Sequence, residues 1–222
     1  MKQLIIRRKG VNNAYINNYK LIIYSFLFFY ILIYMKIYIL RHEDRTQDCS
    51  FFSPLTKIGL DNSIKLIDIL KNENINVIYS SPYIRTLQTI YPYSIKNNIK
   101  VNLEYALCEI QHSDIIAKKS VGLYIPEYIA MSFNYNEKYK SIIKPTEIKY
   151  PETSNDVDAR VKHLLKNILT QHMETDNNIL LVTHQSLCAN MAKIHDKKYE
   201  IDYRKGLLCK VYDNKFLCVK VN

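Results

Sequence analysis

The amino-acid sequence predicts an α/β fold: a three-layer sandwich in which helices flank a mostly parallel central sheet. Short apolar runs typical of buried strands alternate along the chain with segments of helical periodicity. The composition is that of a globular protein, with 48% hydrophobic and 23% charged residues. The 222 residues are enough for one domain that buries most of its apolar surface.

Six apolar segments predict strands. The first four are separated by helical patterns, which favours parallel pairing. The last two flank the polar residues 213–215 and predict a closing hairpin. The six segments are Ile37–Leu40, Asn76–Ser80, Val101–Leu107, Asn178–Thr183, Leu207–Tyr212 and Phe216–Val221.

The first predicted helix begins after Thr56 and runs to about Lys71. The Thr56 side chain can accept a hydrogen bond from the free amides of a first turn, so it is a suitable N-cap. Apolar side chains recur along the helix at helical spacing, which predicts that they form its buried face. These side chains are Leu60, Ile64, Ile67 and Leu70.

Three further helices are predicted. Pro82 is expected in the first turn of the second helix, where its missing N–H is not needed. The third helix extends over Asp156–His172 and the fourth over Ser186–Ile194. The apolar face of the third helix consists of Val157, Val161, Leu164, Leu165 and Ile168.

Residues 111–150 show no clear period and include two prolines, Pro126 and Pro145. We interpret this stretch as an excursion between core elements. Long irregular connections of this kind often carry function. A substrate-specific lid is therefore expected here.

Residues 1–34 differ from the rest of the chain, because they hold five basic residues, no acidic one, and a 14-residue apolar run at 21–34. This run is shorter than the roughly 20 residues that a membrane-spanning helix needs. No small-residue cleavage site follows it. We favour the interpretation that residues 1–34 are an upstream extension and that the domain itself covers 35–222, beginning at Met35. A short membrane anchor at residues 21–34 is the alternative.

The charge and cysteine content limit the possible partners and compartment. The formal net charge is +10, which suits an anionic substrate and also fits a generally Lys-rich composition. No basic stripe with interleaved aromatic residues occurs, so nucleic-acid binding is not predicted. The five cysteines are odd in number and form no Cys-x-x-Cys pair. A reducing, cytoplasmic location is therefore expected.

Polar and charged residues follow each of the four predicted parallel strands. Arg41 and His42 follow the first strand and Arg85 follows the second. Glu109 follows the third strand, and His184 ends the fourth. The carboxyl ends of parallel strands meet at one edge of a sheet, where ligands bind. We therefore expect these five residues to converge on one site.

These residue types suit phosphoryl transfer to a side chain. A neutral imidazole is a good nucleophile near pH 7. A guanidinium holds phosphoryl oxygens through a planar fork of donors. An acid with a raised pKa can protonate the leaving oxygen. The sequence contains no His-Glu-x-x-His, P-loop or Asp-rich metal motif, so neither a metal nor a cofactor is predicted.

Six segments, in this order, resemble motifs of the histidine phosphatase (phosphoglycerate mutase-like) superfamily. The strand that ends in Arg41-His42 is similar to the family's Arg-His-Gly signature, and Leu107–Glu109 matches the Leu-x-Glu that carries the acid. The resemblance extends from Met35 to about Ile194. The remaining segments are Pro54–Gly59, Tyr79–Thr89, Pro151–Thr153 with Arg160–Val161, and Leu180–His184.

The resemblance implies a role for each candidate residue. His42 would take the phosphoryl group as a covalent phosphohistidine. Arg41, Arg85 and His184 would hold the phosphoryl oxygens. Glu109 would protonate the leaving group and then help to activate water. Two other carboxylates near Glu109 in the sequence are its rivals for this role, namely Glu104 and Asp114.

The sequence departs from the family pattern at Glu43, which stands where the family usually has glycine. A carboxylate beside a bound phosphate would repel it. We favour an orientation in which Glu43 points away and pairs with Arg45, leaving catalysis intact. A weakened, phosphate-binding site is the alternative. Gln47 is the only suggested match for an asparagine that the family has nearby, and Gln185 replaces a common glycine.

The resemblance implies a metal-independent phosphoric monoester hydrolase of the histidine acid phosphatase type, in the phosphatase branch. The short excursion between Glu109 and His184 favours a hydrolase over a mutase. A phosphoglycerate-type mutase and a phospho-ligand binding protein are the alternatives. The expected partner is a phosphorylated small molecule or a phosphoprotein, and residues 111–150 are expected to select it.

Overall fold

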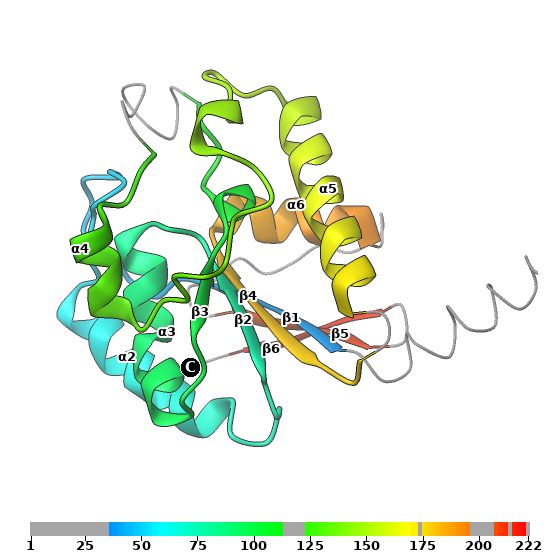
Figure 1. Ribbon diagram of the computed structural model, residues 1–222. Coiled ribbons are helices and arrows are strands. Elements are labelled where there is room, and N and C mark those ends of the chain that lie inside the picture. Colours follow the sequence, from blue (N-terminus) through cyan, green and yellow to red (C-terminus); the bar gives the residue numbers. More distant parts are fainter. Residues whose placement is uncertain (1–35, 113–122, 173–174, 196–206, 213–214, 221–222) are drawn as a thin grey trace, which may run out of the picture.

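The computed structural model describes residues 36–112, 123–172, 175–195, 207–212 and 215–220 (Figure 1). The predicted extension at residues 1–34 and the domain start at Met35 lie outside these ranges. The strands are β1 (Lys36–Arg41), β2 (Val77–Ser80), β3 (Val101–Leu103), β4 (Asn178–Thr183), β5 (Leu207–Tyr212) and β6 (Lys215–Lys220). The α-helices are α2 (Lys57–Ile69), α3 (Ile84–Lys96), α4 (Glu127–Ala130), α5 (Ser154–His172) and α6 (Gln185–His195). Short 3-10 helices are η1 (Tyr105–Leu107), η2 (Met131–Phe133) and η3 (Pro145–Glu147).

The strands of the described part of the chain form one sheet in the order β3-β2-β4-β1-β5-β6. The four strands β1 to β4 pair in parallel. The β5 strand runs antiparallel to both β1 and β6. The mostly parallel sheet and the closing hairpin that the sequence predicts are therefore confirmed.

Helices cover both faces of the sheet, with α2 and α3 on one side and α5 and α6 on the other (Figure 1). Side chains alternate accordingly along β1. Tyr38 and Leu40 belong to the core cluster under α2 and α3, whereas Ile37 and Ile39 belong to the cluster under α5 and α6. Burial on both faces is characteristic of parallel sheets covered by helices. The expected three-layer sandwich is confirmed.

The α2 helix buries a different face from the one that its apolar spacing predicts. Leu60 is 42% exposed and Ile64 is 58% exposed, so the predicted face is wrong at these two positions. Leu70, just past the helix, is fully buried. The side of α2 that faces the protein holds the two small residues Gly59 and Ser63 together with Leu66.

Gly59 explains this choice of face. A Cβ atom built on Gly59 would lie 2.1 Å from the carbonyl oxygen of Asp44, so only glycine permits the observed contact. Thr56 caps the helix as predicted, because its hydroxyl accepts a hydrogen bond from Gly59 N at 3.2 Å. The Thr56 hydroxyl also lies 2.6 Å from Asp44 Oδ2. The start of α2 is thus fixed against the loop that follows β1.

Two further predictions need correction. Pro82 lies before α3 rather than in its first turn, because the helix begins at Ile84 with Tyr83 as N-cap. The β3 strand ends at Leu103 instead of Leu107. The Glu104 side chain accepts a hydrogen bond from Ala106 N, and this contact starts η1 in place of further strand.

The predicted apolar face of the third helix, α5, is largely confirmed. Four of its side chains are buried, and Leu165 packs against the same core from a partly buried position. Arg160 is also buried on this face. The four buried apolar residues are Val157, Val161, Leu164 and Ile168.

Cys108 and Cys188 are buried, and Cys49 is partly buried. Cys209 and Cys218 lie on β5 and β6, where only the backbone is described. Among the described helices, none combines the length and the apolar character that crossing a membrane requires.

The Gly59 contact can be tested by the substitution Gly59→Ala. At an exposed helix position, alanine in place of glycine stabilises a protein by about 1 kcal/mol. Here we expect a loss of about 1–3 kcal/mol in the free energy of unfolding, because the added methyl group meets the backbone of Asp44. Urea unfolding followed by circular dichroism measures this change.

The control is Asp61→Ala, at an exposed position of the same helix, which should change stability by less than about 0.5 kcal/mol. A Gly59→Ala protein as stable as wild type would show that the contact does not determine how α2 packs.

Candidate active site

The carboxyl ends of β1, β2 and β4 bring two histidines and a serine together. His42 follows β1, and its backbone N donates to Thr183 O at 3.0 Å. His184 follows β4. Ser81 follows β2, and its backbone N donates to Val182 O at 2.9 Å. The two histidine ring centroids lie 5.4 Å apart at an interplanar angle of 64°.

The His42 imidazole is buried in a neutral, oriented form. Its Nδ1 lies 2.7 Å from Glu43 O. Because a carbonyl oxygen only accepts, Nδ1 carries the proton and Nε2 keeps a free electron pair. Burial lowers the pKa of His42 to about 3, and the positive charge of Arg85 acts in the same direction. The ring is therefore a neutral base at neutral pH, with its free electron pair on Nε2.

His184 is fully buried beside this ring. Its Nε2 lies 2.9 Å from Ser81 Oγ, and its Nδ1 lies 3.9 Å from Glu109 Oε2. Burial, together with the nearby charge of Arg85, lowers the pKa of His184 well below its ordinary value. The sequence analysis assigned no role to Ser81, which follows β2.

Guanidinium groups surround the two histidines. Arg85 on α3 is 2% exposed, and its Nη1 donates to Ser50 O at 2.8 Å. Arg41 is partly buried at the end of β1. Burial lowers the pKa of both arginines. The negative charge of Glu109 acts in the opposite direction and offsets only part of this decrease. Desolvated guanidinium groups of this kind attract anions strongly.

Arg45 is a third guanidinium near the site that the sequence analysis did not select. Its charge contributes to lowering the pKa of both His42 and Arg85, which places it within electrostatic reach of them. It donates to Thr46 O at 2.6 Å and to Cys49 Sγ at 2.8 Å. Its position three residues after His42 was the signal available in the sequence.

Glu109 is the carboxylate of the site. It is 7% exposed, and its Oε1 accepts a hydrogen bond from Ile110 N at 3.0 Å. Burial raises the pKa of Glu109, and the charges of Arg85 and Arg41 only partly oppose this. A buried carboxyl group with a raised pKa can act as a proton donor closer to neutral pH.

Glu104, the first alternative candidate for the acid, accepts hydrogen bonds outside the site. One of its oxygens accepts from Ala106 N and Ser141 Oγ, at 2.8 and 2.7 Å. The other accepts from Tyr139 OH and Ile142 N, at 2.6 and 3.0 Å. Glu104 therefore ties η1 to the 139–142 segment. The second rival, Asp114, lies outside the described residues.

A buried ion pair fixes the loop that carries Glu109. Arg160 donates from Nε and Nη2 to the two oxygens of Glu152, at 2.9 and 2.8 Å. Its Nη1 donates to the carbonyl oxygens of Ala106 and Cys108, both at 2.9 Å. Glu152 also accepts from Gln111 N at 2.9 Å. This network holds the backbone on both sides of Glu109.

Glu43 is 2% exposed, and its Oε2 accepts a hydrogen bond from Asn62 Nδ2 of α2 at 3.3 Å. Its backbone N donates to Thr89 Oγ1 of α3 at 3.0 Å. The carboxylate therefore has an amide partner on α2, a contact that the sequence analysis did not foresee. Gln47 is exposed on the following loop.

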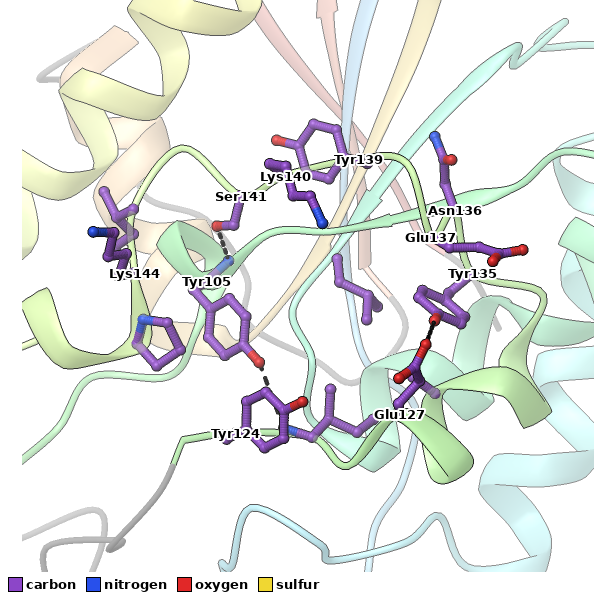
Figure 2. Close-up of a pocket in the computed structure, with 15 residues that line it drawn as sticks. Tyr105, Tyr124, Glu127, Tyr135, Asn136, Glu137, Tyr139, Lys140, Ser141 and Lys144 are labelled. Carbon is purple, nitrogen blue, oxygen red and sulfur yellow. Dashed lines mark hydrogen bonds between the residues drawn. The ribbon is translucent and has the colours of Figure 1, made fainter.

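A separate pocket of about 590 Å³ lies beside the β3 edge, within the excursion that the sequence analysis singled out (Figure 2). Its wall includes the rings of Tyr105, Tyr124 and Tyr135, with Lys140 and Lys144 also on the wall. Within the described residues, no group of three or more His, Cys, Asp or Glu side chains could hold a metal ion.

The structure thus brings all five predicted site residues to one sheet edge. Comparisons with known proteins bear on the fold and the family. No curated protein sequence matches the chain. Solved structures match its fold at low identity. Ecdysone phosphate phosphatase from Bombyx mori, in complex with tungstate, matches with a TM-score of 0.65 and 14% identity over 84% of this chain and 92% of that one.

Two further structures show the same fold. Mycobacterial glucosyl-3-phosphoglycerate phosphatase has a TM-score of 0.55 and 16% identity, covering 79% of this chain and 91% of that one. Phosphoglycerate mutase from Bacillus anthracis has a TM-score of 0.57 and 20% identity, covering 82% and 90%. The family profile described as "Histidine phosphatase superfamily (branch 1)" matches residues 39–200, well over half of the sequence. The chain therefore belongs to the histidine phosphatase superfamily.

Proposed function

We propose that the protein is a phosphomonoester hydrolase that acts through a phosphohistidine on His42. The observation that carries the proposal is the neutral, oriented His42 ring, set beside His184 with buried Arg85 and Glu109 around it. These groups supply a nucleophile, a cradle of positive charge and an acid, which are the parts that phosphoryl transfer needs.

In the first half-reaction, His42 Nε2 attacks phosphorus as the bond from phosphorus to the leaving oxygen breaks. Glu109 gives its proton to that oxygen, so the alcohol leaves neutral. Arg41, Arg85 and His184 hold the phosphoryl oxygens. The Nδ1 proton stays on its hydrogen bond to Glu43 O, which stabilises the charge that the ring acquires.

In the second half-reaction, a water oxygen attacks phosphorus and the Nε2–phosphorus bond breaks. Glu109, now a carboxylate, takes the proton from that water. Inorganic phosphate is released, and both His42 and Glu109 return to their starting forms. This exchange of acid and base roles needs one carboxyl group whose pKa lies near the working pH.

We infer a phosphorylated small molecule or a phosphoprotein as substrate. Support for a small molecule comes from the fold neighbours named as phosphatases of ecdysone phosphate and glucosyl-3-phosphoglycerate. The phosphate group itself would bind at His42. The tyrosine-lined pocket in the excursion is a candidate site for the rest of the substrate molecule.

Replacement of His42 tests the proposed nucleophile. We expect the full chain to hydrolyse p-nitrophenyl phosphate in the presence of EDTA, and His42→Ala to lower kcat by about 10³-fold or more, because the proposed intermediate forms on this ring. The control is His163→Ala, at an exposed position of α5, which should keep wild-type activity. Turnover that survives in His42→Ala would contradict the proposed mechanism.

Glu109→Gln tests the acid. For phenyl phosphate, whose leaving group needs a proton, we expect kcat to fall by about 10²–10⁴-fold. The effect should be smaller for p-nitrophenyl phosphate, which has a better leaving group. Asp61→Asn, which neutralises an exposed carboxylate of α2, is the matched control.

The pH dependence of phenyl phosphate hydrolysis should identify the same group. Because burial raises the pKa of Glu109, its proton is retained to higher pH than in an exposed glutamate. Activity should therefore fall as the pH rises through this raised pKa, and Glu109→Gln should lose that basic limb. A basic limb unchanged in the variant would assign the acid to another group.

A further inference from the structure

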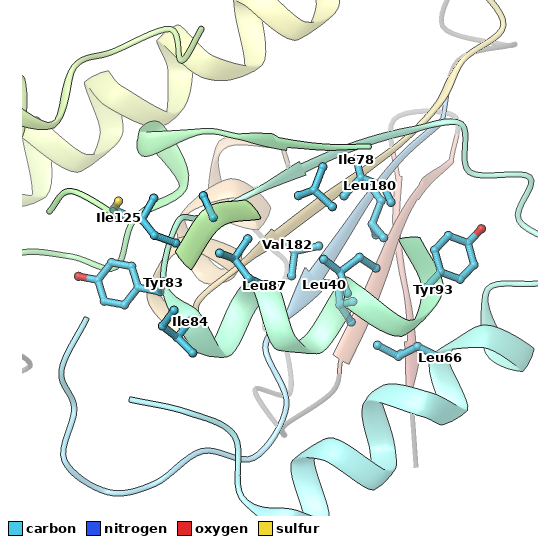
Figure 3. Close-up of a cluster of buried hydrophobic side chains, with 14 of the residues drawn as sticks. Leu40, Leu66, Ile78, Tyr83, Ile84, Leu87, Tyr93, Ile125, Leu180 and Val182 are labelled. Carbon is cyan, nitrogen blue, oxygen red and sulfur yellow. The ribbon is translucent and has the colours of Figure 1, made fainter. Parts of the chain in front are cut away.

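Tyr83 occupies a position between the core and the active site. It lies directly before α3, and its carbonyl oxygen accepts hydrogen bonds from Thr86 N and Leu87 N at 3.1 and 3.2 Å. The side chain is fully buried. Figure 3 shows it at one end of the core cluster, near Ile84 and Ile125.

The ring of Tyr83 contacts two residues of the site. The Cζ atom of Arg85 lies 4.4 Å from the ring centroid, which is a cation–π contact. The ring centroid of His184 lies 4.7 Å from that of Tyr83, at an interplanar angle of 70°. Phe51 also packs against Tyr83, with ring centroids 4.6 Å apart.

This contact bears on the direction of the Arg85 side chain. Within the described residues, the hydrogen bond of the Arg85 side chain runs from Nη1 to Ser50 O. One bond fixes a point of the guanidinium but leaves its plane free to turn. The face of the Tyr83 ring supplies the second restraint, so the donors of the guanidinium keep one orientation.

The hydroxyl of Tyr83 is connected through Gln111 to the loop that carries Glu109. It accepts a hydrogen bond from Gln111 Nε2 at 2.9 Å, and the same amide donates to Glu109 O at 2.7 Å. Gln111 is 2% exposed. Burial raises the pKa of Tyr83, so the hydroxyl stays neutral. One side chain thus connects Arg85, His184 and the backbone of Glu109, which come from three separate elements.

We propose that Tyr83 is a positioning residue for phosphoryl transfer: its ring sets Arg85 and His184, and its hydroxyl sets the loop of Glu109 through Gln111. This inference rests on the proposed function. Small displacements of groups that hold a reacting centre reduce rates strongly, so the loss of Tyr83 should affect kcat as well as binding.

The two parts of the role can be separated by substitution in the full chain. Tyr83→Leu removes the ring face, and we expect kcat for p-nitrophenyl phosphate to fall by about 10- to 100-fold. The inhibition constant of inorganic phosphate should rise as well. Tyr83→Phe keeps the ring and should restore both values to within about threefold of wild type on this substrate, because the cation–π contact remains.

Tyr83→Phe should nevertheless lower kcat for phenyl phosphate, whose leaving group depends on Glu109. Gln111→Leu removes the same hydrogen bond and also the one from Gln111 Nε2 to Glu109 O, so its defect should be at least as large. The double variant should be no worse than Gln111→Leu alone, since Tyr83→Phe then has no remaining hydrogen bond to Gln111 to break. Additive effects of the two substitutions would overturn the role of the hydroxyl.

Tyr93→Leu is the matched control, because Tyr93 is a buried tyrosine of the same cluster, at the other end of α3. It should lower stability without changing kcat or phosphate inhibition. A Tyr83→Leu protein with the kinetics of Tyr93→Leu would overturn the proposed role of the ring. If Tyr83→Leu does not fold, Tyr83→Met, which keeps more of the volume without a ring face, takes its place with the same expected results.

Failure of this inference can be distinguished from failure of the proposed function. Loss of turnover in His42→Ala, together with unaffected kinetics in Tyr83→Leu, would reject only the role of Tyr83. Turnover that persists in His42→Ala would reject the mechanism on which that role depends.

Discussion

The geometry of the site depends on the pairing of β1 with β4. The two strands run parallel with Arg41 opposite Thr183, and the hydrogen-bond ladder continues one residue further through His42 N and Thr183 O. His42 and His184 therefore leave the sheet from adjacent strands at the same level. Their rings meet because the backbone register brings them together, and the surrounding helices add the charged groups.

This arrangement concentrates positive charge without protonating the imidazoles. Burial and the nearby guanidinium groups act in the same direction on His42 and His184, and both lower the pKa of the ring. Burial acts in the opposite sense on the acid and keeps a proton on Glu109 to higher pH. A nucleophilic base and a proton donor can therefore exist together in one small volume.

Local patterns in the sequence were sufficient for the framework. Strand β4, the Thr56 cap and the apolar face of α5 follow from runs and spacings within a few residues. Arg41, His42, Arg85 and His184 were found because each stands at the end of a strand or in the first turn of a helix. Glu109 was placed after a strand that ends earlier in the structure, at Leu103, and the structure still brings all five residues together. Their catalytic roles remain proposals.

The errors have a common physical origin in contacts between distant segments. The buried face of α2 is set by the fit of Gly59 against Asp44 together with the burial of Leu66. The side chain of Glu104 bonds to Ala106 N where β3 ends, and the same carboxylate is held by Tyr139 and Ser141, which lie 35 and 37 residues further along the chain. The contact between Tyr83 and Gln111 joins residues 28 positions apart, and no periodic pattern records it.

The ion pair between Glu152 and Arg160 has an evolutionary consequence. Both side chains are almost fully buried, so a change at either position alone would leave an unpaired charge in the core, at a cost of about 3–5 kcal/mol. That is a large share of the roughly 5–15 kcal/mol by which a typical domain is stable. Descendants of this protein can therefore lose the pair only by changing both codons nearly together, and the two positions should covary among its relatives.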